Sequence, residues 1–386
     1  MKGFFKRLGE TWTIIGVTLL LLVLVEVFFR IYLSFSSSPD SRVTADCYQD
    51  ADWVEDYYRE FARCNESRWE SYSYWRRKPF EGEFIRVDED GIRRTFTKSH
   101  PLSNSEPGVK LFFFGGSSMW GTGVRDGYTI PSLTGNELIR QGINPSITNF
   151  GESGYVSTQE VISLMTELKK GNIPDLVVFY DGVNDIFSSY QSGEAGIPQN
   201  EKNRQMEFNT LREKKKSLLV FLNSLKTLST VQFLTKQFGA DNTVIREKEE
   251  AEGELPATQT AHHYNENIRQ VNALAKEYGF YALFYWQPTI FGKPYRSSYE
   301  EQEKGKAQPI QGFVEEVNEL LFADDLAYEN IRFYNLSDLF MTNRDPVFID
   351  WCHVSEKGNL IIAQRMMRDI KPIIDSLDTS KRQFNE

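Results

Sequence analysis

The sequence predicts a three-layer α/β/α sandwich around a mostly parallel five-stranded sheet, preceded by one transmembrane helix. Two observations predict it. After residue 108, short runs of β-forming residues alternate with segments of helical periodicity, which is typical of a parallel sheet with helices on both faces. Near the amino terminus lies an uncharged apolar run long enough for a helix to cross a membrane.

Composition allows a globular body with a sizeable core and argues against nucleic-acid binding. The chain has 386 residues, of which 40% are hydrophobic, and a formal charge of −10. Four basic and two acidic side chains lie in the first 33 residues, so the remainder carries −12. Because an acidic body without a basic stripe is poorly suited to phosphate backbones, we expect no nucleic-acid partner.

The N-terminal segment predicts a signal anchor. Residues 1–10 are short and basic, which favours a cytoplasmic tail, and residues 11–35 form the predicted membrane-spanning helix. Glu26 and Arg30 share a helix face, so they can pair or reach toward the membrane boundary. The alternative is a signal peptide cleaved near Ser34–Ser36, a poor cleavage site. Either way, we expect the body to be extracytoplasmic, in the periplasm or at the cell surface.

Residues 36–108 precede the main domain. Their serine-rich start, to about residue 46, predicts a tether. The aromatic and charged stretch 50–80 predicts a partly helical segment that covers one edge of the domain or rests on the membrane. Residues 84–97 predict a hairpin or an extended lead-in around the turn Asp90-Gly91.

The three cysteines fit no metal-ligand spacing. Outside the cytoplasm, Cys47 and Cys64 can form a disulfide, which leaves Cys352 as a buried thiol. The alternative is that all three stay unpaired as small hydrophobic residues. We expect no metal and no organic cofactor.

The main domain is expected over residues 109–378. Strands are predicted at residues 109–114, 146–150, 176–180, 280–286 and 331–335. Helices are predicted at residues 130–141, 158–170, 262–278, 313–322 and 355–377. The interval 187–260 is too long for a simple crossover. Within it, the amphipathic run 217–238 predicts a lid, a docking element for a protein partner, or a helix packed across the domain.

The run VKLFFFGGSSMWG, residues 109–121, predicts a displayed nucleophile. A buried strand ends at two glycines, and two serines follow. Glycine permits a sharp turn and lets a substrate come close, so Ser117 is expected to present its hydroxyl at the carboxyl edge of the sheet. Ser118 is the alternative nucleophile, and an ordinary glycine-serine turn is the alternative to both.

Other groups needed for acyl transfer follow later strands. Of the four histidines, only His353 lies three residues after an acid, Asp350, so one loop can hold the imidazole and its carboxylate. Gly154 follows the second strand and Asn184 the third, where their amides can donate to an oxyanion. Taken singly, these residues are also ordinary capping, turn and loop residues.

In combination these blocks resemble the SGNH hydrolase family, also called GDSL-like esterases, over residues 109–374. The resemblance implies a flavodoxin-like sheet and a serine hydrolase. It implies that Ser117 is the nucleophile, His353 the general base and acid, and Asp350 the carboxylate that orients the imidazole. It also implies an oxyanion hole made by the Ser117 and Gly154 amides with the Asn184 side chain.

The expected function is hydrolysis of an O-acyl ester, on a small molecule, a lipid or a glycan, through an acyl-enzyme. The sequence departs from the family at Gly116, which stands where the family has aspartate; because that aspartate is not part of the triad, the chemistry survives its absence. Two alternatives stay open. One is an O-acetyltransferase acting on a surface glycan, and the other is a non-catalytic protein of the same fold that binds a glycan or a partner.

Overall fold

The structure is a computed structural model that describes residues 2–35, 40–95, 108–212, 228–237, 256–323 and 328–383. The chain forms two compact units. One consists of residues 1–39 and 200–249, and the other of residues 40–199 and 250–386. The second unit contains the predicted sheet.

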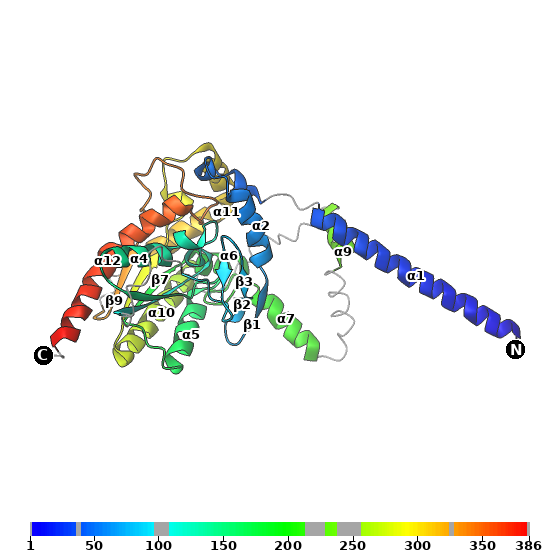
Figure 1. The fold of residues 1–386 in the computed structure, drawn as a ribbon, viewed down its shortest axis with the longest axis horizontal. Coiled ribbons are helices and arrows are strands. Elements are labelled where there is room, and N and C mark those ends of the chain that lie inside the picture. Colours follow the sequence, from blue (N-terminus) through cyan, green and yellow to red (C-terminus); the bar gives the residue numbers. More distant parts are fainter. Residues whose placement is uncertain are drawn as a thin grey trace. The chain divides into compact units, whose positions relative to one another are not determined.

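The five predicted strands form one parallel sheet, in the order β6-β5-β7-β8-β9. Figure 1 labels β7 and β9 of this sheet. The five strands are β5 (Val109–Gly115), β6 (Pro145–Asn149), β7 (Leu176–Asp181), β8 (Tyr281–Trp286) and β9 (Ile331–Asn335). Because β5 lies between β6 and β7, the direction in which the chain builds the sheet reverses beside it. Ligand sites of such sheets collect at this point, above the carboxyl ends of the strands.

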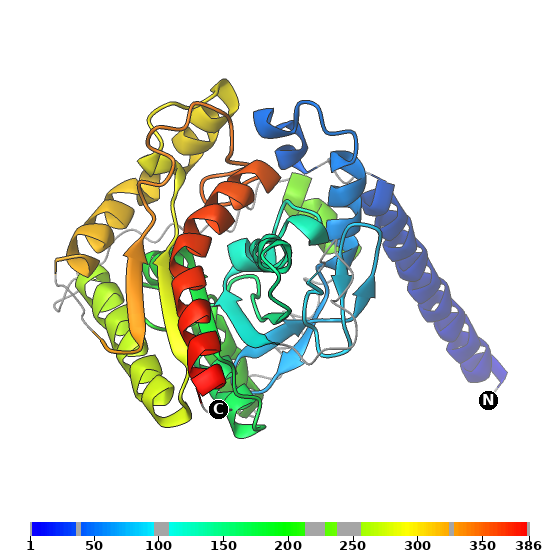
Figure 2. The same ribbon diagram turned by 60° about the vertical axis from the view of Figure 1, so that its left-hand side comes forward.

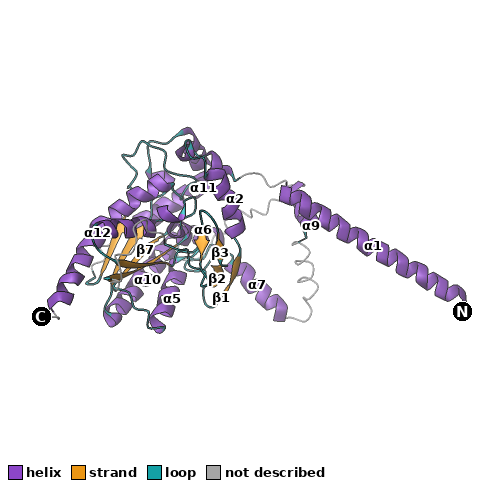
Figure 3. Cartoon of the chain, viewed as in Figure 1, coloured by secondary structure: helices purple, strands orange, loops and turns teal. Residues whose placement is uncertain are grey.

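Helices cover both faces of the sheet, so the three-layer prediction is confirmed (Figures 2 and 3). One layer contains α4 (Ile130–Arg140) and α12 (Glu356–Gln383), and the other contains α5 (Ser157–Lys169), α10 (Pro256–Tyr278) and α11 (Ser298–Leu321). Side chains alternate along β5, so Phe112 and Phe114 join one core while Leu111 and Phe113 join the other. The shorter elements of this body are α3 (Ser117–Trp120), η3 (Asp126–Tyr128), α6 (Val183–Ser192) and η5 (Ile290–Gly292).

Residues 40–95 fold onto the same unit as the sheet. They form η1 (Ser41–Thr44), η2 (Asp46–Tyr48), α2 (Val54–Cys64), β1 (Ser67–Glu70), β2 (Tyr74–Arg77), β3 (Phe80–Glu81) and β4 (Arg86–Val87). Their aromatic side chains build a third core with Trp120 and Ile349 of the sheet domain. The tether expected up to residue 46 is therefore wrong from residue 41 onward, because these residues form short helices that pack on the domain.

Around Asp90-Gly91, the predicted hairpin is a tight turn closed by a single bridge between Val87 and Arg93.

All three cysteines lie in the described part of the chain, and none is in a disulfide. Cys64 and Cys352 are buried, and Cys47 is partly buried.

The first unit contains α1 (Lys2–Phe35), α7 (Glu201–Arg212) and α9 (Ser229–Gln237). By length and composition, Gly9–Tyr32 of α1 can cross a membrane. The Glu26 carboxylate accepts hydrogen bonds from the backbone N–H groups of Ser229 and Thr230, at 2.6 and 3.0 Å, so it caps α9 instead of pairing with Arg30. Of the amphipathic run 217–238, residues 217–227 and 238 lie outside the described residues, and the part that is described packs on α1 through Phe233 and Phe29.

Candidate active site

Ser117 begins the short helix α3 directly after β5, and the two glycines before it make the turn possible. A Cβ atom on Gly115 would lie 2.3 Å from the carbonyl oxygen of Tyr180. A Cβ atom on Gly116 would lie 2.1 Å from Nδ2 of Asn184. The contact at Gly115 is with the backbone and excludes a side chain there, whereas a side chain at Gly116 would require the Asn184 amide to move.

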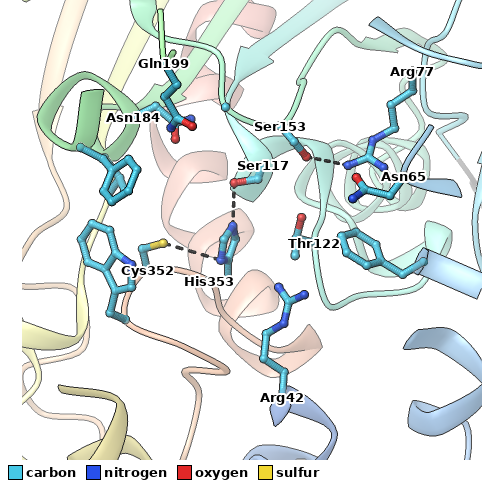
Figure 4. Close-up of a pocket in the computed structure, with 15 residues that line it drawn as sticks. Arg42, Asn65, Arg77, Ser117, Thr122, Ser153, Asn184, Gln199, Cys352 and His353 are labelled. Atoms are coloured by element: carbon cyan, nitrogen blue, oxygen red, sulfur yellow. Dashed lines mark hydrogen bonds between the residues drawn. The ribbon is translucent and has the colours of Figure 1, made fainter. Parts of the chain in front are cut away.

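Ser117, His353 and Asp350 form a continuous hydrogen-bonded chain. Ser117 Oγ lies 2.6 Å from His353 Nε2 (Figure 4). His353 Nδ1 lies 2.7 Å from Asp350 Oδ2. Since a carboxylate can only accept, Nδ1 carries the hydrogen, and Nε2 accepts from the serine hydroxyl. One loop before α12 thus holds both the imidazole and the group that orients it.

The Asp350 carboxylate is held in its ionised form. Burial acts to raise the pKa of Asp350, but the neighbouring His353 and two backbone N–H bonds act in the opposite direction and keep the pKa well below its usual range. Those N–H groups belong to Cys352 and His353, and they lie 3.0 and 2.8 Å from Oδ1. At neutral pH a negative charge therefore faces the imidazole and favours the imidazolium that forms when it takes a proton.

The two adjacent serines have different surroundings. Ser118 is buried, and its Oγ lies 3.4 Å from Nε2 of Gln287. Ser117 lines a cavity and contacts the imidazole. The geometry therefore brings Ser117, and not Ser118, to the base.

Asn184 and Gly154 lie on the wall of the same cavity as Ser117. Asn184 is the second residue of α6, which follows β7, and Gly154 lies in the loop after β6 with a φ of 81°. Within the described residues, neither the Asn184 side chain nor the Gly154 backbone N–H donates a hydrogen bond. Their amides thus remain available to a developing oxyanion beside Ser117.

The cavity has a volume of about 300 Å³ and a partly polar wall (Figure 4). Besides the predicted residues, its polar lining includes Arg42, Asn65, Arg77, Thr122, Ser153 and Gln199. Three of these come from residues 40–95, which the sequence did not connect with the site. The only sequence pattern that could have linked this segment to the site was a pair of arginines in an aromatic stretch, Arg76-Arg77. No pattern in the sequence pointed to Arg42.

Arg42 brings a positive charge beside the Asp350 carboxylate. Its Nε and one terminal nitrogen donate to Asp40 at 2.9 and 2.7 Å, and its other terminal nitrogen lies 3.7 Å from Asp350 Oδ2. The guanidinium also lies over the rings of Tyr58 and Phe61, with 5.1 and 5.4 Å to the ring centroids. The segment that follows α1 therefore reaches the candidate triad directly.

Arg77 holds the loop that carries Gly154. One terminal nitrogen donates to Ser153 Oγ at 2.8 Å, and the Arg77 backbone N–H donates to Glu152 Oε2 at 3.0 Å. Both Arg77 and Glu152 are buried, so this pairing orders the loop away from solvent.

Asp350, Cys352 and His353 are also the described residues whose ligand atoms lie close enough for a metal ion, within 4.8 Å of one another. The imidazole nitrogens are, however, already hydrogen-bonded to Asp350 and Ser117. Burial and the charge of Asp350 raise the pKa of the Cys352 thiol well above its usual value, which disfavours a thiolate ligand. The group fits a hydrogen-bonded triad better than a metal site. Of the other histidines, His262 and His263 lie within α10, and His100 lies outside the described residues.

Comparison with known proteins gives similar structures of low identity. Acetyl xylan esterase AlAXEase is 15% identical with a TM-score of 0.36, over 68% of this chain and 100% of that chain. Axe2, an acetylxylan esterase from Geobacillus stearothermophilus, is 15% identical with a TM-score of 0.35, over 68% and 94%. A member of the lipolytic protein G-D-S-L family from Veillonella parvula DSM 2008 is 15% identical with a TM-score of 0.39, over 67% and 96%. We draw no conclusion about substrate from similarities of this size.

No protein with curated annotation matches the sequence. The match to a protein family is more informative than the structural similarities. The family described as GDSL-like Lipase/Acylhydrolase matches residues 111–366, which is well over half of the chain and spans every candidate site residue. The resemblance seen in the sequence is thereby confirmed: the chain belongs to the GDSL-like lipase and acylhydrolase family and is an ester-hydrolysing enzyme.

Proposed function

We propose that the protein is a membrane-anchored, extracytoplasmic serine esterase that cleaves an O-acyl ester through Ser117, His353 and Asp350. One observation carries the proposal: an unbroken hydrogen-bonded chain from carboxylate to hydroxyl opens onto a cavity with unpaired amide donors. The location is supported by the apolar helix Gly9–Tyr32 and by the basic residues that precede it.

The geometry suits a two-step mechanism. Ser117 Oγ attacks the ester carbonyl carbon while His353 Nε2 takes the hydroxyl proton. The oxyanion of the tetrahedral intermediate accepts from the Ser117 and Gly154 N–H groups and from the Asn184 amide. When the C–O bond to the alcohol breaks, His353 returns the proton to the departing oxygen, and an acyl-enzyme remains. Water then attacks the acyl carbonyl and gives its proton to His353, which restores the Ser117 hydroxyl as the acid leaves.

A fluorophosphonate probe tests the nucleophile, and the adjacent serine provides a matched control. We expect the wild type and Ser118→Ala to be labelled, and Ser117→Ala to be unlabelled and at least about 10³-fold slower on a short-chain ester. Labelling that persists in Ser117→Ala would show that another residue is the nucleophile. A folded wild type that neither reacts with the probe nor hydrolyses esters would favour the non-catalytic binding protein.

A second candidate function is acyl transfer, such as O-acetyl transfer, to a glycan hydroxyl. It is favoured by the polar wall of the cavity, where Asn65 and Thr122 offer hydrogen-bonding groups to a hydroxylated acceptor. Product analysis with an acylated sugar distinguishes the two. Free acid in equal amount with and without an acceptor sugar indicates hydrolysis, whereas an acylated acceptor indicates transfer.

A further inference from the structure

A second hollow lies beside the cavity that contains Ser117. It is a groove of about 220 Å³ between α6 and α11. Its apolar lining consists of Phe187, Tyr190, Ala307, Pro309, Ile310 and Trp351. Phe187 and Trp351 also line the catalytic cavity, so the two hollows share a wall.

Two walls of the groove, α6 and the loop that carries His353, also carry candidate catalytic groups. Asn184, Phe187 and Tyr190 are spaced three residues apart on α6, so one face of this helix leads from the oxyanion donor into the groove. Trp351 stands in the loop that carries His353. On the far side, Ala307 and the buried Ile310 of α11 complete the groove.

The polar side-chain groups of Tyr190, Lys306 and Glu303 in the groove are already paired. The Tyr190 hydroxyl donates to the carbonyl oxygen of Pro309 at 3.1 Å, and Lys306 forms an ion pair with Glu303. Few hydrogen-bonding groups are thus left for a polar ligand. The catalytic cavity differs, because two arginines and several amide and hydroxyl groups line it.

An ester consists of an acyl part and an alcohol part. The two hollows differ in polarity, since the groove is mainly apolar and the catalytic cavity is polar. We propose that the groove between α6 and α11 binds the acyl chain of the substrate, while the polar cavity binds the alcohol part. The inference rests on the proposed esterase function and makes it more specific: the preferred substrates carry an apolar acyl group longer than acetyl.

A chain-length series on the purified full chain tests the inference. We expect kcat/KM for p-nitrophenyl esters to rise from acetate through butyrate to hexanoate, by about fourfold for each methylene that enters the groove. Ala307→Trp fills the groove without touching the catalytic groups. In this variant we expect at least a tenfold loss on hexanoate and a change of less than twofold on acetate. Glu316→Trp, an exposed position on the same helix, is the matched control and should keep the wild-type profile.

The outcomes separate this inference from the proposed function. A wild type that hydrolyses acetate as fast as hexanoate, or an Ala307→Trp variant that loses both activities equally while folded, overturns the acyl-chain site and leaves the esterase function standing. Absence of hydrolysis on every ester overturns the esterase function itself. If Ala307→Trp does not fold, Ala307→Leu narrows the groove less and should shift the preferred chain to a shorter length; an unchanged preference overturns the inference.

Discussion

Two regions meet at the cavity, and the hydrogen-bond donors that they bring to it differ in their pairing. The loops at the carboxyl ends of the strands carry the candidate oxyanion donors Asn184 and Gly154, whose amides donate to no described residue. Residues 40–95 carry arginines whose donors are largely used within the protein. The candidate oxyanion donors are thus left free toward the cavity, while the arginines that hold the site in place are paired.

Arg93 is the clearest example of the second kind. It is fully buried, and its guanidinium donates to the Asp126 carboxylate and to three carbonyl oxygens at and just after the end of α3, those of Trp120, Gly121 and Val124. Asn184 is the clearest example of the first kind, since its side chain makes no hydrogen bond to any described residue.

The comparison predicts its largest effect at Arg93. Arg93→Met leaves the buried Asp126 carboxylate without its guanidinium partner and removes a donor from the carbonyl groups of Trp120 and Val124, so we expect the free energy of unfolding to fall by about 3–5 kcal/mol. Arg94→Met is the neighbouring control, because the Arg94 side chain is 53% exposed and, among the described residues, forms only a surface ion pair with Glu81; its loss should cost less than about 1 kcal/mol. Denaturant unfolding of the purified protein measures both. Equal stability of the two variants would contradict the conclusion that the paired, buried arginines of residues 40–95 hold the site in place.

The opposite pattern is expected at Asn184. Asn184→Ala should lower kcat by about 10²–10³-fold, because one oxyanion donor is lost, and should leave the unfolding midpoint unchanged. Asn65→Ala removes another amide from the cavity wall and is the control, with an expected loss of less than about fivefold on a small ester. A fall in kcat of less than about tenfold for Asn184→Ala would remove this residue from the oxyanion hole.

Arg42 joins the two regions, and its effect should be the smallest. Arg42→Gln removes a positive charge beside Asp350 and removes the ion-pair partner of Asp40, so the negative charge of Asp350 at the site is less well balanced than in the wild type. We expect kcat/KM to fall about tenfold and the acidic limb of its pH profile to move to higher pH. Arg42→Lys keeps the charge and should keep the limb close to its wild-type position. The same profile in all three proteins would show that Arg42 has only a structural role.

Local patterns were sufficient for the sheet. Residues 109–114 read as a buried strand because apolar side chains fill both faces, and the structure extends this strand by one residue. Local patterns were insufficient to predict where helices begin. The helix predicted from residue 313 begins at Ser298, where Ser297 and Glu300 form a capping box that the apolar periodicity does not reveal.

By itself, the sequence determined the order of strands and helices and the apolar N-terminal helix. It also determined which candidate site residues lie at the carboxyl ends of the strands. These follow from side-chain periodicity and turn chemistry, which act over a few residues. Only the tertiary structure decided that Arg42 lies beside Asp350 and that α6 and α11 enclose an apolar groove next to the cavity. Such contacts join residues far apart in the chain, and they depend on how complete elements pack, which no local pattern records.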